Sequence, residues 1–135
     1  STIKESIKSI KKGKILGIFP EGGITSTKLT KAKAGAIFIA SKANTQILPV
    51  SISGGDNAWD DLLNGVRSRI TVNIGKPFGP IDIKGSKEEK ISKLEDYSQE
   101  LMCRIAALLP EDRHGEYSND ERIPKYRKEN KLDLL

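Results

Sequence analysis

The chain has 135 residues, of which 36% are apolar and 30% charged, and this balance is typical of one ordinary globular domain. Its single cysteine, Cys103, excludes an internal disulfide, and the longest apolar run, residues 34–40, is far too short to cross a bilayer. Eight lysines against two glutamates occupy residues 1–33, so the whole excess of the +5 net charge lies at one end. We expect an anionic partner for that end.

The first half of the chain predicts a helix, a buried strand, a loop and a second helix. Thr2 and Glu5 have the spacing of a capping box, which starts a helix that Gly13 ends. The apolar run before Pro20 is typical of a buried strand, and the glycines and hydroxyls after it indicate a loop. The four elements cover residues 2–12, 15–19, 21–30 and 33–43.

The second half predicts two strands, a short helical excursion between them and one long helix. Ser86 and Glu89 form a second capping box, and the apolar face that follows continues until Pro110. The predicted strands are residues 46–52 and 69–74, the excursion is 56–65, and an extended exit loop is 75–80. We divide the chain into a domain portion, 1–110, and a polar C-terminal extension, 111–135, either ordered or frayed.

Alternating helices and strands predict an α/β sandwich, with a mixed sheet that contains some parallel strands and is flanked by helices. Three strands under three helices leave a sheet edge open, which favours self-association. The chain begins at Ser1, without methionine and inside a helix signal. We therefore expect it to be a piece of a longer protein that lacks an N-terminal part of the domain.

The segment most suited to chemistry is residues 19–26, where the first predicted strand runs into two glycines and two hydroxyls. Backbone N–H groups in such a turn can bind an anion, and the next predicted helix adds the positive end of its dipole. Lys28, Lys31 and Lys33 follow closely. The segment matches neither a P-loop nor a dinucleotide-binding fingerprint, so we predict a phosphate site of another kind.

Five blocks of the chain resemble the glycerophospholipid acyltransferases, the family that includes the lysophosphatidate acyltransferases. Residues 19–22, Phe-Pro-Glu-Gly, are similar to the start of that family's Phe-Pro-Glu-Gly-Thr-Arg-Ser block. Residues 33–36 and 47–52 resemble its lysine-x-glycine helix start and its apolar-Pro-Val strand. Residues 74–77 resemble its Gly-Lys-Pro segment, and 109–117 a C-terminal pattern of some members. The blocks occur in the family's order over nearly the whole chain.

The resemblance implies transfer of an acyl group from acyl-CoA or acyl-carrier-protein to a hydroxyl of a phosphate-bearing acceptor, with no metal and no other cofactor. In the family a His-x-x-x-x-Asp motif supplies the general base. This chain has no such motif, because its one histidine, His114, has Asn119 five places on. We interpret His114 as a surface or structural residue. We expect no catalytic residue in the chain and no activity from it alone.

The family's Thr-Arg pair is replaced by Gly23-Ile24, which removes the arginine expected to bind the acceptor phosphate. Three interpretations stay open: the nearby lysines replace the arginine, the acceptor differs, or the site has lost its function. The residues predicted to bind the phosphate are Glu21, Gly22, Gly23, Thr25, Ser26 and Lys33. Lys33 matches the family lysine, while for Glu21 a structural role in the loop is favoured.

These observations predict part of a phospholipid-biosynthesis acyltransferase that acylates a lysophosphatidate-like acceptor. Its expected partners are the lysophospholipid acceptor, the acyl donor and the membrane surface, and its expected location is cytoplasmic, peripheral at the inner face of the membrane. One alternative is a non-catalytic domain of the same fold that binds phosphate or lipid headgroups, and another is an acyltransferase with a different lipid acceptor. Nucleic acid is not expected, because the chain has few aromatic residues and its excess charge is confined to one end.

Overall fold

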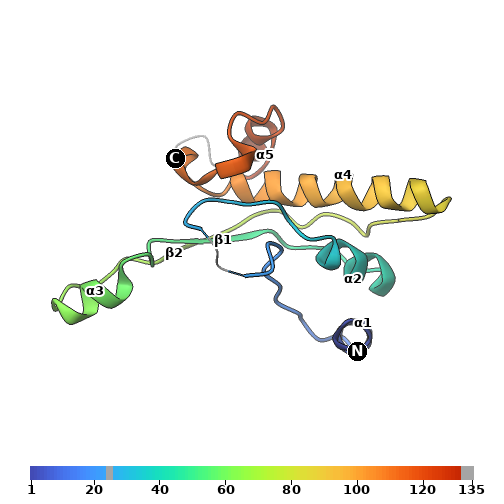
Figure 1. Cartoon of the computed structure of the whole chain (residues 1–135), viewed down its shortest axis with the longest axis horizontal. Helices are drawn as coiled ribbons and strands as arrows, with labels where there is room; N and C mark the ends of the chain where they lie inside the picture. The colour runs from blue at the N-terminus through green and yellow to red at the C-terminus, as the bar shows by residue number, and fades with distance from the viewer. Residues whose placement is uncertain (24–25, 132–135) are drawn as a thin grey trace.

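The computed structural model describes residues 1–23 and 26–131. Helices and a small sheet alternate along this part of the chain (Figure 1), which confirms the predicted α/β class of a partial domain. In chain order the elements are α1 (Thr2–Lys11), α2 (Gly35–Ala43), β1 (Val50–Ser53), α3 (Ala58–Leu63), β2 (Thr71–Ile74), α4 (Lys87–Ala106), the 3₁₀ turns η1 (Glu111–Arg113) and η2 (Gly115–Tyr117), and α5 (Ile123–Glu129).

The long helix α4 is the centre of the core. Its first turn is capped by the Ser86 hydroxyl, which accepts the Glu89 amide at 3.2 Å, as the sequence predicts. The apolar stripe toward its C-terminal end is buried, and the Met102 and Cys103 side chains are fully enclosed. Helix α2 and the sheet contact one side of α4, and α5 contacts the other (Figure 1). Elements from both halves of the sequence therefore pack against this one stripe.

The C-terminal segment is part of the same core. Tyr117, Ile123 and Tyr126 are buried together with the α4 stripe. The Arg104 guanidinium lies 4.5 Å from the Phe78 ring centre and 4.3 Å from that of Tyr126, close enough for cation–π attraction to both. Of the two forms expected for the extension, ordered and frayed, the described residues up to 131 take the ordered one.

The sheet consists of β1 and β2, which pair antiparallel. The parallel pairing expected from the sequence is not present in residues 1–23 and 26–131, because the chain returns directly through the short α3 excursion. Strand β1 also begins later than predicted, at Val50, although Ile47 forms an isolated bridge with Phe78. The sheet is thus a two-stranded ribbon that rests on α4.

The two faces of this ribbon are reversed from the usual arrangement. Ser51 and Asn73, a cross-strand pair, face α4, and both side chains donate to the Leu108 carbonyl, at 3.0 and 2.9 Å. The residues on the opposite face are large and β-branched, yet they are exposed: Val50, Ile52, Val72 and Ile74. We refer to these four residues as the outer sheet face. An apolar face of this kind normally contacts a further layer of structure.

The prediction of a buried strand at residues 15–19 is wrong for this chain. The segment is extended but has no strand partner in the described residues, and the Ile15 side chain is completely exposed. A strand requires a neighbour for its backbone N–H and C=O groups, and β1 pairs only with β2. The apolar run therefore has the composition of a buried strand without the sheet that would bury it.

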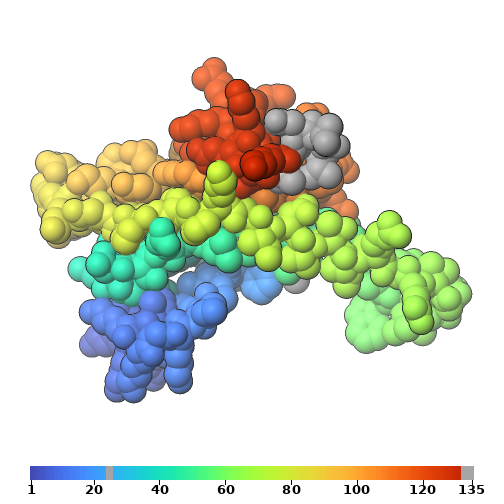
Figure 2. Space-filling model, turned by 180° about the vertical axis from the view of Figure 1, so that it is seen from behind, coloured from blue at the N-terminus to red at the C-terminus, as the bar shows by residue number. Residues whose placement is uncertain are grey.

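Helices α1 and α3 project from the body of the molecule. Figure 2 shows them as two separate arms with open space between them. No residue of α1 is buried, although α1 contacts α2, and α3 exposes Trp59, Leu62 and Leu63. None of the helices in the described ranges has the length and apolar character that crossing a bilayer requires.

Candidate anion-binding site

The predicted phosphate loop folds into a turn that brings Gly22 against Lys33. The Gly22 amide donates to the Phe19 carbonyl at 3.0 Å, and the Lys33 amide donates to the Pro20 carbonyl at 2.8 Å. The Lys33 side chain then crosses Gly22 so closely that a Cβ there would lie 2.7 Å from its Nζ atom. Gly22 also has φ of +81°, which favours glycine. Only glycine allows this approach of the ammonium group to the backbone.

Glu21 holds the loop closed. Its Oε2 atom accepts two hydrogen bonds from Thr30, one from the amide and one from the hydroxyl, each at 2.8 Å. The carboxylate is half-buried and faces the loop's own backbone. This geometry supports the structural role favoured for Glu21 over contact with a substrate hydroxyl.

The start of α2 lies just after Lys33. The helix begins at Gly35, two residues later than predicted, with Ala34 at the N-cap position. Alanine cannot accept a hydrogen bond through its side chain, so the first N–H groups of α2 have no side-chain cap in the described residues. Such groups, together with the helix dipole and the exposed Lys33 ammonium, can bind an anion.

The other predicted site residues are not brought together in the same way. Gly23 is exposed beside open space, and the Ser26 hydroxyl accepts the Lys28 amide at 3.1 Å in a local turn. Thr25 lies outside the described residues. Lys31 forms an ion pair with Glu95 on α4 at 3.2 Å. The described residues therefore bring Gly22 and Lys33 together, and they direct Lys31 toward α4.

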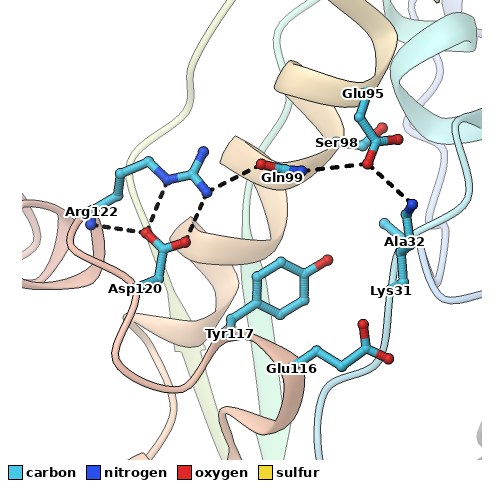
Figure 3. A pocket seen from close by; sticks show the side chains of 9 residues that line it. All are labelled: Lys31, Ala32, Glu95, Ser98, Gln99, Glu116, Tyr117, Asp120 and Arg122. Carbon is cyan, nitrogen blue, oxygen red and sulfur yellow. Dashed lines mark hydrogen bonds and ion pairs between the residues drawn. The ribbon is translucent and has the colours of Figure 1, made fainter. Parts of the chain in front are cut away.

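A polar pocket behind the loop explains where Lys31 is directed (Figure 3). Its side chains form a continuous hydrogen-bonded series from the loop, across α4, to the C-terminal segment. In order these residues are Lys31, Glu95, Gln99, Arg122 and Asp120. The hydrogen bond from Lys31 lowers the pKa of Glu95, and the one from Arg122 lowers the pKa of Asp120. Because these groups satisfy one another, the pocket is a structural junction.

Three residues that the sequence did not predict also shape the loop: Leu29, Asp56 and Arg113. Leu29 is buried and is bonded through its backbone to the C-terminal segment. The Arg113 guanidinium donates to the Thr27 carbonyl at 3.1 Å and to the Asp56 carboxylate, and it lowers the pKa of Asp56. The one sequence signal for these contacts is the block at residues 109–117, which contains Arg113.

His114 is buried, and its Nε2 atom lies 3.1 Å from the Leu109 carbonyl oxygen. Of the two interpretations given for this residue, the structural one holds and the surface one is wrong. An imidazole enclosed in this way cannot approach a substrate at the loop. Cys103 is equally inaccessible, and burial raises the pKa of its thiol to about 12.

Comparisons with known proteins match the part of the chain that contains this loop and α2. Residues 1–53 match the family model described as Acyltransferase. The 1-acyl-sn-glycerol-3-phosphate acyltransferase of Bacillus subtilis (strain 168) is 31% identical over 103 residues, which are 75% of this chain and 50% of that protein. Both similarities support the glycerophospholipid acyltransferase family for this chain. It spans about half the length of this curated relative. No solved structure gives a significant match.

Proposed function

We propose that this chain supplies the acceptor-phosphate site of an O-acyltransferase. The enzyme transfers an acyl group from acyl-CoA or acyl-carrier-protein to a hydroxyl of a lysophosphatidate-like acceptor. The supporting observation is the Lys33 ammonium held over Gly22 beside the uncapped start of α2. A phosphate monoester fits this site because it is a compact dianion that accepts several N–H bonds. Gly23 borders the site, and Thr25 and Ser26 stay predicted contributors.

The catalytic base of the proposed enzyme lies outside this chain. The single histidine is enclosed and bonded to a carbonyl, so it has no access to the acceptor hydroxyl. We propose that a segment carrying the His-x-x-x-x-Asp pair completes the domain and covers the outer sheet face. The 50% coverage of the Bacillus subtilis relative and the exposed apolar side chains of that face support this arrangement. The chain alone is then inactive, and self-association through the sheet is a competing way to cover the same surface.

We propose further that the enzyme acts at the cytoplasmic face of the membrane, on acceptors held in the bilayer surface. The lysines within residues 1–33 support this, because they attract anionic headgroups or an acidic carrier protein. The exposed apolar side chains of α3 project from the body and are available for the same surface. No metal ion or further cofactor enters the proposal.

The test compares acyl transfer to lysophosphatidate by this chain and by the full-length protein that contains it. We expect turnover only from the full-length protein. In that protein, Lys33→Gln raises KM for lysophosphatidate roughly ten-fold, the equivalent of about 1.4 kcal/mol for one lost charge-assisted bond. Lys42→Gln is the matched control, since Lys42 is an exposed lysine in the last turn of α2, away from the helix start that follows Lys33.

Turnover by the isolated chain would overturn the assignment of the base to another segment. Equal KM values for the two lysine variants would remove Lys33 from the site. Activity on another lipid acceptor but not on lysophosphatidate would favour the alternative suggested by Ile24, which stands where the family has arginine. Phosphate binding without any acyl transfer would favour a non-catalytic binding domain.

A further inference from the structure

The C-terminal residues 113–117, which we call the strap, bind directly to the phosphate loop. The Leu29 amide donates to the Arg113 carbonyl at 3.0 Å, and the Glu116 amide donates to the Leu29 carbonyl at 3.2 Å. Both backbone groups of Leu29, the amide and the carbonyl, are thereby bonded to the strap. This is the only place in the loop where a buried apolar side chain coincides with backbone bonds to a distant segment, within the described residues.

The fit between strap and loop leaves no space at Gly115. A Cβ atom there would lie 2.1 Å from the Leu29 carbonyl oxygen, and the residue has φ of +55°. A side chain at this position would therefore push the loop backbone away. The contact is a close backbone-to-backbone approach that depends on glycine.

Arg113 extends the contact to a third segment. Its Nη1 atom donates to the Thr27 carbonyl at 3.1 Å, and its Nη2 atom pairs with the Asp56 carboxylate, three residues after β1 ends. One planar guanidinium thus ties the loop to the end of a strand. These bonds use one N–H of each terminal nitrogen and fix the guanidinium between the loop and Asp56.

We propose that Arg113 is a positioning residue for acceptor binding, and that the strap holds residues 27–33 in the conformation that places Lys33 over Gly22. This inference rests on the proposed function, because the site that is positioned is the acceptor-phosphate site. Arg113 acts through Thr27 and Leu29, and it does not touch the substrate. The C-terminal segment is then a part of the binding machinery, although it lies 80 residues or more from the loop in sequence.

The experiment uses the full-length protein and two readouts, hydrogen–deuterium exchange of peptides covering residues 26–33 and the KM for lysophosphatidate. Arg113→Gln is expected to speed exchange in those peptides about ten-fold and to raise KM by a similar factor, with a smaller change in kcat, because two hydrogen bonds to the loop and to Asp56 are lost. Arg113→Lys keeps the charge but reaches only one of the two acceptors, so it should give intermediate values. Gly115→Ala is a second, independent disruption of the same contact and should act in the same direction.

Arg127→Gln is the matched control. Arg127 also lies in the C-terminal segment, but it donates to the Leu109 carbonyl, just after α4, and forms an ion pair with Glu111. We expect it to lower the melting temperature without changing loop exchange or KM. The proposal is overturned if Arg113→Gln leaves loop exchange unchanged, or if Arg127→Gln changes loop exchange and KM to the same extent. If the wild-type protein shows no acyl transfer, the proposed function fails, and the exchange data alone decide whether the strap orders the loop.

Discussion

The side of the molecule around α4 and the outer sheet face contain similar side chains in opposite environments. Around α4, aliphatic residues such as Ile37 and Met102 are completely enclosed. On the outer sheet face, Ile52 and Val72 are more than half exposed, although they lie opposite each other in regular strands. An apolar composition therefore favours the burial of a surface, but the burial itself requires a second layer of helices or strands that packs on it. In the part of the chain that the structure describes, the residues around α4 have this second layer and the outer sheet face does not.

The first test of this comparison opens a cavity in the core around α4. Met102→Ala should destabilise the protein by about 2–5 kcal/mol, because the removed atoms leave a space that the surrounding side chains cannot fill. Urea unfolding followed by circular dichroism measures the change. Ile91→Ala, on the exposed part of the same helix, is the control and should have a much smaller effect. Equal losses in the two variants would contradict the asymmetry described above.

The second test concerns the polar junction that fastens the C-terminal segment to α4. Asp120 accepts two bonds from the Arg122 guanidinium, at 2.9 and 2.8 Å, and these lower the pKa of its carboxyl group. A lowered pKa means that its contribution is present above about pH 4 and is lost as the pH falls below that value. Asp120→Asn should therefore cost about 1–2 kcal/mol at neutral pH.

Melting temperatures measured against pH would check this prediction. The difference between the wild type and Asp120→Asn should begin to shrink below about pH 4 and keep shrinking as the pH falls, because the carboxyl group of the unfolded chain takes up a proton before the one bonded to Arg122 does. Glu121→Gln, at the exposed neighbouring position, serves as the control. A constant difference between wild type and Asp120→Asn at every pH would show that the loss comes from packing and not from the carboxylate.

The smallest effect on stability is expected on the outer sheet face. Ile52→Thr should change the stability of the isolated chain by less than about 0.5 kcal/mol, as for other exposed positions. It should nevertheless reduce any concentration-dependent association of the chain, because it removes apolar area from the outer sheet face. Sedimentation velocity at several concentrations measures this. A large loss of stability in a monomer would mean that the face is already covered by part of the same chain.

The elements that sequence reasoning predicted are those with local signals. The Ser86 cap of α4 is encoded by the four residues 86–89, and the apolar stripe that follows has helical spacing. The prediction of a strand at residues 15–19 failed, because a strand forms only with a neighbour that the local sequence cannot supply. Gly22 and Lys33 lie together because one turn and the start of α2 are adjacent in the chain, while their role in binding stays a prediction.

The rest of the site depends on contacts between distant residues. Arg113 and Thr27 are 86 positions apart, and no periodicity or spacing rule connects them. Lys31 looked equivalent to Lys33 in the sequence, yet its partner Glu95 lies on α4. A single sequence shows which residues have the right chemistry, while the fold decides which of them meet.

The two hydrogen bonds to the Leu108 carbonyl also decide which way the ribbon is turned. A slip of one residue in each strand would exchange the faces, so that Ile52 and Val72 would face α4. Burial of apolar area would favour that exchange, while the bonds from Ser51 and Asn73 oppose it, with about 1 kcal/mol each. The observed register is thus a competition between a polar anchor and apolar attraction. The covering segment proposed above would remove that competition, and it would thereby select the register as well as bury the surface.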